Sequence, residues 1–440
     1  MLIEPIIYQD PNISQEAEYS RYVKDRVLVR ILVSLNNGSM KLPSPDPITY
    51  FARTLCRSQR QRFGIKRNDR LSHVYVIGKT GAGKSTLLET MMIQDIANGE
   101  GFTLLDPHGD LAERIAKAIP EHRKKDLIYF DVSDPHQPYG YNPLKRVAPD
   151  KRSLAASGIL EVFHKTWGER AWGQRMEHIL RNALLLLLEQ PNATLADLLR
   201  LFRDEKYRTE AAKRCRNEKV REFWQLEYPK YSRFAAEAVA PIQSKVSAFL
   251  SDPVLCRVLT TAEKPIHIRK MMDDGKILLV NLAKGKLGED SASLLGGLLV
   301  TTLGLAAFSR ADIPEQDRRP HYLYMDEFQS FTTLSLANML SELRKYKVGM
   351  VLAHQYLNQL EPDIRHAVLG NAATLISFRL GAQDAGYVGQ EFEPVFDGVD
   401  VLGLPNYHIY LKLLIDGEPS RPFSATTLQS RNYQLQKHFK

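Results

Sequence analysis

Apolar and polar residues follow two different periods along this chain of 440 residues. From His73 onward, a short apolar stretch (His73–Ile77) precedes a glycine-rich loop (Gly78–Ser85) and then a segment with helical spacing (Thr86–Ala97). Asn98-Gly99 follows the last helical turn, where a residue that tolerates left-handed backbone commonly ends a helix. The pattern therefore predicts a strand, a loop and a helix in succession.

The alternation of strands and helices continues and then returns near the end of the chain. Further strands are predicted at Phe102–Leu105, Leu127–Val132, Lys276–Asn281, His321–Met325, Gly349–Ala353 and Thr374–Arg379, and helices at Leu111–Ala118, Ser291–Phe308 and Leu334–Lys345. A final strand pair, His408–Leu414 and Phe423–Thr426, flanks an Asp416-Gly417 turn. Strands that alternate with helices indicate an α/β fold with a mostly parallel sheet.

Between about Tyr139 and Glu263 the period is helical almost throughout. One apolar face is spaced by three and four residues: Met176, Ile179, Leu180, Ala183, Leu184 and Leu187. We expect an all-α insertion over residues 141–263 that divides the α/β domain into 67–140 and 264–440. Residues 1–66 are expected to form a small N-terminal appendage, β-rich because Val27–Leu35 is typical of a strand.

Charge is concentrated in the helical region. The chain has a formal net charge of +8 and a pI near 9.1, and residues 144–235 hold 19 Lys or Arg against 12 Asp or Glu. A basic segment permits a polyanionic partner. Solvated helix faces explain the same excess equally well, and a second basic run lies at Arg53–Arg70.

Three features bear on location. The cysteines Cys56, Cys215 and Cys256 are scattered, odd in number and without metal-ligand spacing, which favours a reducing compartment. The start of the chain lacks the cationic opening of a signal peptide. The uncharged run Ser291–Ser309 is long enough to cross a membrane, but its Gly, Ser and Thr content favours a buried helix. We expect a cytoplasmic protein without a membrane span of its own.

The loop after the first strand has the G-x-x-x-x-G-K-S pattern. Its residues are Gly78, Lys79, Thr80, Gly81, Ala82, Gly83, Lys84 and Ser85, with Thr86 starting the helix. Glycines let backbone N–H groups converge on phosphate oxygens, and the helix directs its positive end at the same anion. Lys84 is expected to reach the β- and γ-phosphates of ATP, and Ser85 to ligate Mg²⁺. An accidental glycine-rich turn is the alternative.

An acidic pair follows the strand His321–Met325. Asp326 is expected to complete the Mg²⁺ shell, and Glu327 to polarise the attacking water as a general base. The added Glu favours hydrolysis over phosphoryl transfer to another substrate. A surface acidic pair at a strand end is the alternative.

Other polar residues follow predicted strands and helices. Gln355 lies where a side chain could sense the γ-phosphate, and Arg344 and Arg379 are candidate arginine fingers from a neighbouring subunit. Asp106 is expected near the nucleotide, or as a cap of the next helix. His108 lacks partners at metal spacing, so Mg²⁺ is the single metal predicted.

Taken in order, five segments resemble the HerA/FtsK superfamily: IGKTGAGKST, DPHGDL, LYMDEF, LRKYKVGMVLAHQ and LPNYHIYLKLLIDG. The likeness is greatest to the cytoplasmic ATPase of type IV secretion coupling proteins, which drive conjugative DNA transfer, and covers about Arg67 to Leu428. It implies a RecA-like P-loop core, a six-membered ring with ATP sites between subunits, and DNA in the central channel. By the same resemblance Arg344 matches the finger and Gln355 the γ-phosphate sensor.

The resemblance also implies partners and leaves alternatives open. Coupling proteins usually begin with transmembrane helices, which this sequence lacks, so a relaxase, nuclease or secretion-system partner would recruit it to the inner membrane or to another DNA process. Two rival functions remain: a ring motor with a protein or nucleoprotein client, and a nucleotide-gated scaffold without turnover. For DNA contact, the candidates are a flexible loop at Ala283–Lys286 and base stacking by aromatic residues of the insertion. These are Trp167, Trp172, Trp224 and Tyr228, for which helix packing is the commoner role.

Overall fold

The computed structural model describes residues 46–55, 60–145, 147–260 and 263–429. From Pro47 onward these residues belong to one compact unit. The predicted strand Val27–Leu35 lies outside the described residues.

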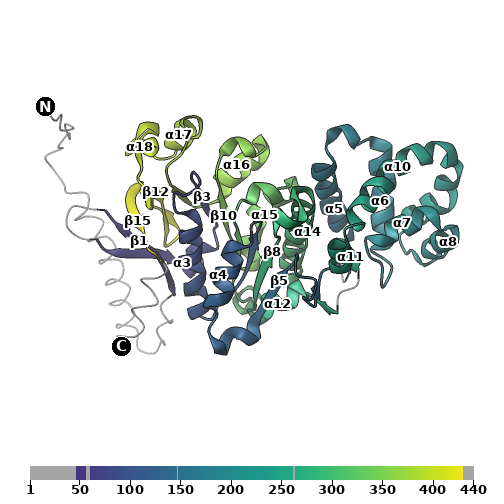
Figure 1. Cartoon of the computed structure of the whole chain (residues 1–440), viewed down its shortest axis with the longest axis horizontal. Coiled ribbons are helices and arrows are strands. Elements are labelled where there is room, and N and C mark those ends of the chain that lie inside the picture. The colour runs from purple at the N-terminus through teal and green to yellow at the C-terminus, as the bar shows by residue number, and fades with distance from the viewer. Residues whose placement is uncertain (1–45, 56–59, 146, 261–262, 430–440) are drawn as a thin grey trace. The chain divides into compact units, whose positions relative to one another are not determined.

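An eleven-stranded sheet forms the centre of this unit (Figure 1). Its parallel part runs, in spatial order, β11 (Thr374–Ser377), β3 (Val74–Ile77), β10 (Val348–His354), β9 (His321–Met325), β4 (Gly101–Asp106), β8 (Ile277–Asn281) and β5 (Leu127–Asp131). These strands occupy the predicted positions to within two residues. The α/β class with a mostly parallel sheet is confirmed.

Four antiparallel strands extend the sheet beyond β11. They are β12 (His408–Lys412), β15 (Phe423–Thr427), β1 (Ile48–Thr54) and β2 (Arg62–Lys66). Residues 1–66 were expected to form a separate appendage, and for the strands β1 and β2 that expectation is wrong: Ala52 pairs with Thr427, and Phe51 and Ala52 are fully buried. A pairing partner some 370 residues away leaves no signal in local periodicity.

The predicted turn between β12 and β15 is confirmed in detail. β13 (Leu414–Ile415) and β14 (Glu418–Pro419) pair on either side of Asp416 and Gly417, whose φ angles are 53° and 83°. Positive φ at both central residues is the geometry that a tight hairpin turn requires. The Asp69 carboxylate accepts from the N–H groups of both turn residues, at 2.8 and 2.9 Å.

Helices cover both faces of the sheet, and side-chain alternation decides which residues each face receives. On one face, Val74 and Val76 pack with α3 (Lys84–Ala97) and α4 (Asp110–Ala118). On the other, Tyr75 and Ile77 share a core with α14 (Glu289–Phe308), α15 (Leu334–Glu342) and α16 (Pro362–Asn371). Because successive residues of a strand point to opposite faces, one short strand supplies both cores.

Helix α14 explains the long uncharged run of the sequence. The apolar helical stretch Glu289–Asp312 is long enough to cross a membrane, but 78% of its most apolar window is buried inside the fold. Close packing uses its glycines: a Cβ at Gly297 would lie 3.1 Å from Val162 of α5 (Arg152–Trp167). α14 is a core helix, as the sequence favoured.

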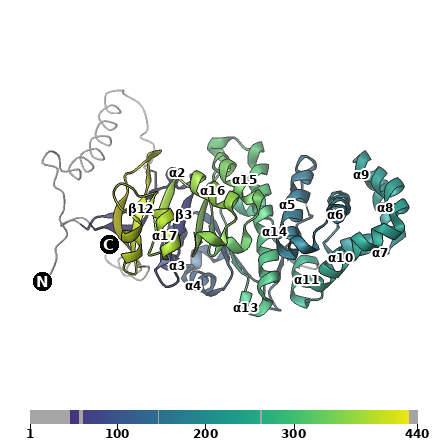
Figure 2. The same cartoon turned by 90° about the horizontal axis from the view of Figure 1, so that it is seen from above.

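All described elements between Pro149 and Thr260 are helical. After α5 they include α6 (Gln174–Leu187), α7 (Ala196–Arg203), α8 (Glu205–Arg214), α9 (Glu218–Glu222), α10 (Ser232–Leu250) and α11 (Pro253–Thr260). At the two ends of this region β6 (Tyr139–Gly140) pairs with β7 (Lys264–Pro265). Figures 1 and 2 show that α6, α7 and α8 lie beyond α5 and α14, at the end of the sheet opposite β1.

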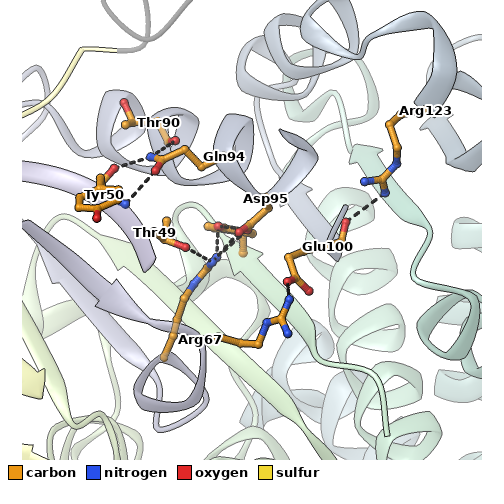
Figure 3. A network of polar contacts seen from close by, with 10 residues as sticks. Thr49, Tyr50, Arg67, Thr90, Gln94, Asp95, Glu100 and Arg123 are labelled. Carbon is orange, nitrogen blue, oxygen red and sulfur yellow. Dashed lines mark hydrogen bonds and ion pairs between the residues drawn. The ribbon is translucent and has the colours of Figure 1, made fainter. Parts of the chain in front are cut away.

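A buried polar network ties the phosphate-loop helix to its surroundings. Arg70, at the end of α2 (Arg67–Arg70), donates to both carboxylate oxygens of Asp95 on α3, at 2.6 and 2.7 Å. The Tyr324 hydroxyl of β9 donates to the same carboxylate at 2.6 Å. Nearby, the Gln94 side-chain amide forms two hydrogen bonds with the backbone of Tyr50 on β1: it accepts from the N–H group and donates to the carbonyl (Figure 3). The C-terminal half of α3 is thus fixed to three other elements.

Removing the Asp95 carboxylate should strongly destabilise the protein. In Asp95→Ala the fully buried Arg70 keeps its charge without a counterion, a loss of about 3–5 kcal/mol in the free energy of unfolding. Urea denaturation measures this loss. Glu113→Ala, which removes the exposed Glu113–Lys117 pair, is the control and should leave the midpoint unchanged. Equal effects of the two variants would contradict the role of the buried pair.

Buried histidines should make stability fall in mild acid. His73 is typical: its Nδ1 accepts from Met350 N–H at 3.0 Å, its Nε2 lies 2.8 Å from the Leu340 carbonyl, and burial lowers its pKa to about 4. The unfolded chain, with a pKa of about 6.5, binds more protons below that pH, so the free energy of unfolding decreases from about pH 6.5 toward pH 4. His321 and His354, each with a pKa lowered to about 3 by burial, act in the same direction.

The variant His73→Asn tests how much His73 contributes to the pH dependence of the free energy of unfolding. Asn can accept from Met350, tolerates the positive φ of 68° at this position, and does not titrate. Denaturation between about pH 7 and pH 5 should show a slope smaller by up to about 1.4 kcal/mol per pH unit than in the wild type. The exposed His122→Asn should keep the wild-type slope. An unchanged slope in His73→Asn would refute the assignment.

Candidate functional site

The predicted site residues gather at one edge of the sheet, where the parallel strands end. Gly78 follows β3, Asp326 follows β9, Gln355 follows β10, and Asp106 ends β4. Since β3, β10, β9 and β4 are neighbours in the sheet, their carboxyl ends form a continuous row. In open α/β sheets this edge is where ligands bind.

The glycine-rich loop wraps around the amino end of α3. Gly81 and Gly83 have φ angles of 76° and 123°. A Cβ at Gly83 would lie 2.9 Å from the ring of Tyr407 and 3.0 Å from that of Phe378, so both backbone angle and space demand glycine. The loop therefore has the backbone freedom that phosphate binding by N–H groups requires.

Lys84 is held inside this loop. Only 6% of the residue is exposed, and its ammonium group donates to the carbonyls of Gly78 at 2.6 Å and Lys79 at 3.1 Å. Burial lowers its pKa, against the opposite effect of the carboxylates of Asp326 and Glu327. A buried ammonium group directed into the loop suits the binding of phosphate charge.

Ser85 and Asp326 form an oxygen-rich pair. The Ser85 hydroxyl donates to Asp326 Oδ2 at 3.1 Å, and Asp326 is 8% exposed. Burial raises the pKa of Asp326, and the nearby Asp106 raises it further. A desolvated carboxylate beside a hydroxyl is a donor set that fits Mg²⁺, which prefers oxygen ligands and uses few of them from the protein.

Glu327 has left-handed backbone, with a φ angle of 46°. This conformation costs a non-glycine residue about 1–3 kcal/mol and is concentrated at functional sites. Its Oε1 accepts from Gln355 Nε2 at 2.7 Å, and Gln355 Oε1 accepts from the Thr80 hydroxyl at 2.7 Å. The glutamate predicted as general base is therefore hydrogen-bonded to the glutamine predicted as sensor, and through that glutamine it is connected to the phosphate loop.

The DPHG segment supplies a contact that the sequence did not indicate. His108 Nε2 lies 3.1 Å from Glu327 Oε2. Asp106 accepts from the N–H groups of His108 at 3.0 Å and Ala112 at 2.9 Å, and thus serves the start of α4. Asp106 thus acts as a cap, one of its two expected roles, and also lies close enough to raise the pKa of Asp326.

The two candidate arginines lie in different places. Arg344 is exposed in a helical turn before β10 (Leu343–Tyr346), at the sheet edge opposite the phosphate loop of the same chain. Arg379 lies beside that loop: its carbonyl accepts from Lys79 N–H at 2.9 Å, and its guanidinium donates to Asn406 Oδ1 at 3.0 Å. Within one chain, only Arg379 joins the site.

The loop Ala283–Lys286 is not the flexible segment expected for DNA contact. Residues 284–287 form one helical turn, α13 (Lys284–Leu287). Lys284 pairs with Glu289 at 2.7 Å, and Lys286 donates to the Ser133 hydroxyl at 3.3 Å. Lys284 is therefore paired with the acidic start of α14, and Lys286 contacts the segment that follows β5. Sequence periodicity could not indicate either contact.

The aromatic residues of the insertion pack against its helices. Trp224 is 3% exposed and donates its indole N–H to the Asn182 carbonyl at 3.2 Å. The ring of Trp167 stacks on Phe163 with centroids 4.6 Å apart, and Trp172 donates to Glu177 at 3.0 Å. Packing, the commoner role, describes these contacts, and Trp224 cannot stack on a base.

Many charges of the insertion also have local partners. Arg181–Glu177, Lys213–Glu210 and Lys219–Glu222 are ion pairs one helical turn apart, at 3.0, 2.9 and 2.9 Å. Such pairs belong to solvated helix faces. The net positive excess of the segment remains, since the acidic residues are fewer than the basic ones.

Helix α5 contacts the segment that follows Glu327. Lys165 donates to the carbonyls of Gln329 at 2.7 Å and Thr332 at 2.9 Å, and Glu161 accepts from Ser335 N–H at 2.7 Å. The first helix of the insertion thus holds the segment that runs from Gln329 to the start of α15.

Sequence reasoning missed two kinds of residue here. The sequence shows only that His108 lies two residues after the strand β4. That β4 is the neighbour of β9, which brings His108 close to Glu327, is known from the sheet order alone. Tyr407 and Phe378 flank Gly83, and Tyr407 N–H donates to the Ala82 carbonyl at 2.8 Å. Tyr407 belongs to the LPNYH segment noted in the sequence. Its contact with the phosphate loop joins residues more than 300 positions apart, which local patterns cannot indicate.

Two comparisons with known proteins agree with this architecture. A family model described as the type IV secretion-system coupling protein DNA-binding domain matches residues 63–386. Comparison with curated protein sequences gives no match.

Solved structures share the fold. The bacterial conjugative coupling protein TrwBdeltaN70, unbound, superposes with a TM-score of 0.61 at 17% identity, covering 88% of this chain and 96% of that one. TrwB in complex with ADP and Mg²⁺ gives 0.58 at 17% identity, over 89% and 97%. VirB4 of Thermoanaerobacter pseudethanolicus gives 0.62 at 12% identity, over 90% and 100%. These likenesses establish the RecA-like P-loop fold.

Proposed function

The chain belongs to the family of type IV secretion-system coupling protein DNA-binding domains, and on that premise we propose that it is an ATP-driven DNA translocase that works as a ring of six copies. One observation carries the proposal. Lys84, Ser85, Asp326, Glu327 and Gln355 lie together at the carboxyl edge of the sheet, where Ser85 is hydrogen-bonded to Asp326 and Gln355 to Glu327. A scaffold that only binds nucleotide has no need of Glu327 in a strained backbone held at both carboxylate oxygens.

The residues divide the chemistry of hydrolysis among them. Backbone N–H groups of residues 78–86 and the ammonium of Lys84 bind the phosphates of ATP. Ser85 and Asp326 are the residues that would hold Mg²⁺, which supplies positive charge to offset the charge developing on the phosphate oxygens. Glu327 orients the attacking water and accepts its proton. The new bond joins the water oxygen to the γ-phosphorus, and the bond to the bridging oxygen breaks with its electron pair left on ADP.

Gln355 and the arginines complete the site. Gln355 bridges Thr80 and Glu327, so a change at the γ-phosphate reaches the general base through one side chain. Arg344 is exposed at the sheet edge opposite its own site, and this placement suits a finger that enters the site of a neighbouring copy. Arg379, fixed to Asn406 beside the loop, acts within its own chain.

DNA is the proposed client, contacted without regard to sequence. Family membership and the basic excess of residues 144–235 support this. Contacts of Lys and Arg with phosphates give binding that weakens steeply with salt. The proposed location is the cytoplasm, with a relaxase, nuclease or secretion-system partner bringing the ring to its substrate or to the inner membrane.

Steady-state ATP hydrolysis tests the central claim. We expect DNA to stimulate the wild type strongly at low salt, less at moderate salt, and not at all in Glu327→Gln, whose amide cannot accept the proton of water. Binding of labelled ATP to Glu327→Gln should persist, which shows that the site is intact. If the wild type hydrolyses ATP at a rate that ignores DNA at every salt concentration, a protein client replaces DNA. Binding without turnover would identify a scaffold.

Mixing inactive variants tests the finger. Arg344→Ala should lower the rate by about a thousandfold, yet co-expression with inactive Lys84→Ala should restore part of it, because each copy supplies what its neighbour lacks. Arg379→Ala is the matched control: its defect lies in the same site as Lys84, so that mixture should stay inactive. An inactive Arg344→Ala mixture would exclude a finger from a neighbouring copy, provided that the ring assembles.

A further inference from the structure

We propose that His108 is a positioning residue that holds the Glu327 carboxylate in its catalytic orientation. The inference rests on the proposed hydrolysis and extends it to a side chain outside the phosphate loop and the acidic pair. His108 Nε2 lies 3.1 Å from Glu327 Oε2, while Gln355 Nε2 donates to Oε1 at 2.7 Å. Both oxygens of the carboxylate are therefore engaged at once.

The two contacts come from opposite sides of Glu327. In the sheet β9, which precedes Glu327, lies between β10 and β4. Gln355 follows β10, and His108 follows β4. A carboxylate held from both neighbouring strands has little freedom to rotate about its terminal bond. This matters for a base on left-handed backbone, where a free side chain would adopt other directions.

Backbone contacts fix the loop that carries His108. Its N–H donates to Asp106 Oδ1 at 3.0 Å, and the carbonyl of the preceding Pro107 accepts from Lys284 N–H at 2.8 Å. Gly109 follows with a φ angle of 93°, and a Cβ there would lie 2.2 Å from Asn281 Oδ1. Only glycine permits this close approach to β8, so the backbone on both sides of His108 is fixed.

Burial distinguishes His108 from a residue of the core. Its side chain is 54% exposed, against 17% for Glu327. More than half of the imidazole is therefore in contact with solvent, whereas the Glu327 carboxylate, on whose direction the proposed hydrolysis depends, is mostly covered. The fixed loop instead places the ring nitrogen of His108 3.1 Å from the Glu327 carboxylate.

The experiment compares His108→Ala, His108→Gln and the exposed control His122→Ala in DNA-stimulated ATP hydrolysis by the full chain. We expect His108→Ala to lower kcat about 10- to 100-fold, as loss of an orienting contact does, with KM for ATP within about twofold. His108→Gln, whose amide reaches a similar point and can donate, should recover most of the rate. His122→Ala should match the wild type.

A double variant separates positioning from a structural effect. In the Glu327→Gln background the base is already absent, so adding His108→Ala should reduce the residual rate no further. A wild-type kcat in His108→Ala would overturn the proposal, as would a raised KM with no rescue by Gln, or full additivity with Glu327→Gln. If the wild type itself shows no hydrolysis, the proposed function fails, and that outcome is read from the wild-type arm alone.

Discussion

The buried pair of Arg70 and Asp95 is the interaction on which the arrangement of the candidate site depends. Asp95 lies on α3, the helix that begins at Lys84, and its carboxylate receives both Arg70 and the hydroxyl of Tyr324. Tyr324 is two residues before Asp326 on β9. One carboxylate thus fixes the helix that follows the phosphate loop relative to the strand that precedes Asp326, the proposed Mg²⁺ ligand. An unpaired charge at this depth would cost several kcal/mol, so the elements can separate only at that cost.

At the amino end of the same helix, beside Asp326, charged side chains are concentrated with little access to solvent. Burial lowers the pKa of Lys84 and raises that of Asp326, which means that each charge is held against a desolvation cost. Asp106 adds a second carboxylate nearby. Such a site favours binding of a phosphate with its divalent cation, because together they satisfy both the ammonium and the carboxylates.

The helical insertion shares its core with the sheet and is not an independent body. The apolar cluster that contains Tyr75 and Ile77 of β3 continues through α14 and α5 to Leu180 and Leu184 of α6. Lys165 and Glu161 on α5 are hydrogen-bonded to the backbone of the segment that follows Glu327. A continuous packed path therefore joins the insertion to the segment beside Glu327, an arrangement that suits the proposed motor, in which DNA and ATP would bind at different parts of the chain.

The sequence by itself determined the parallel α/β core, the phosphate loop and the acidic pair, because each depends on residues adjacent in the chain. A loop of closely spaced glycines before Lys84, or a buried strand before Asp326, carries its chemistry locally. Tertiary structure alone decided what depends on distant pairing: β1 joins β15, and Lys284 and Lys286 meet acidic or hydroxyl partners instead of forming a free loop. It also brought His108 to Glu327 across 219 positions, since the order of strands in the sheet, which local periodicity does not encode, makes β4 the neighbour of β9.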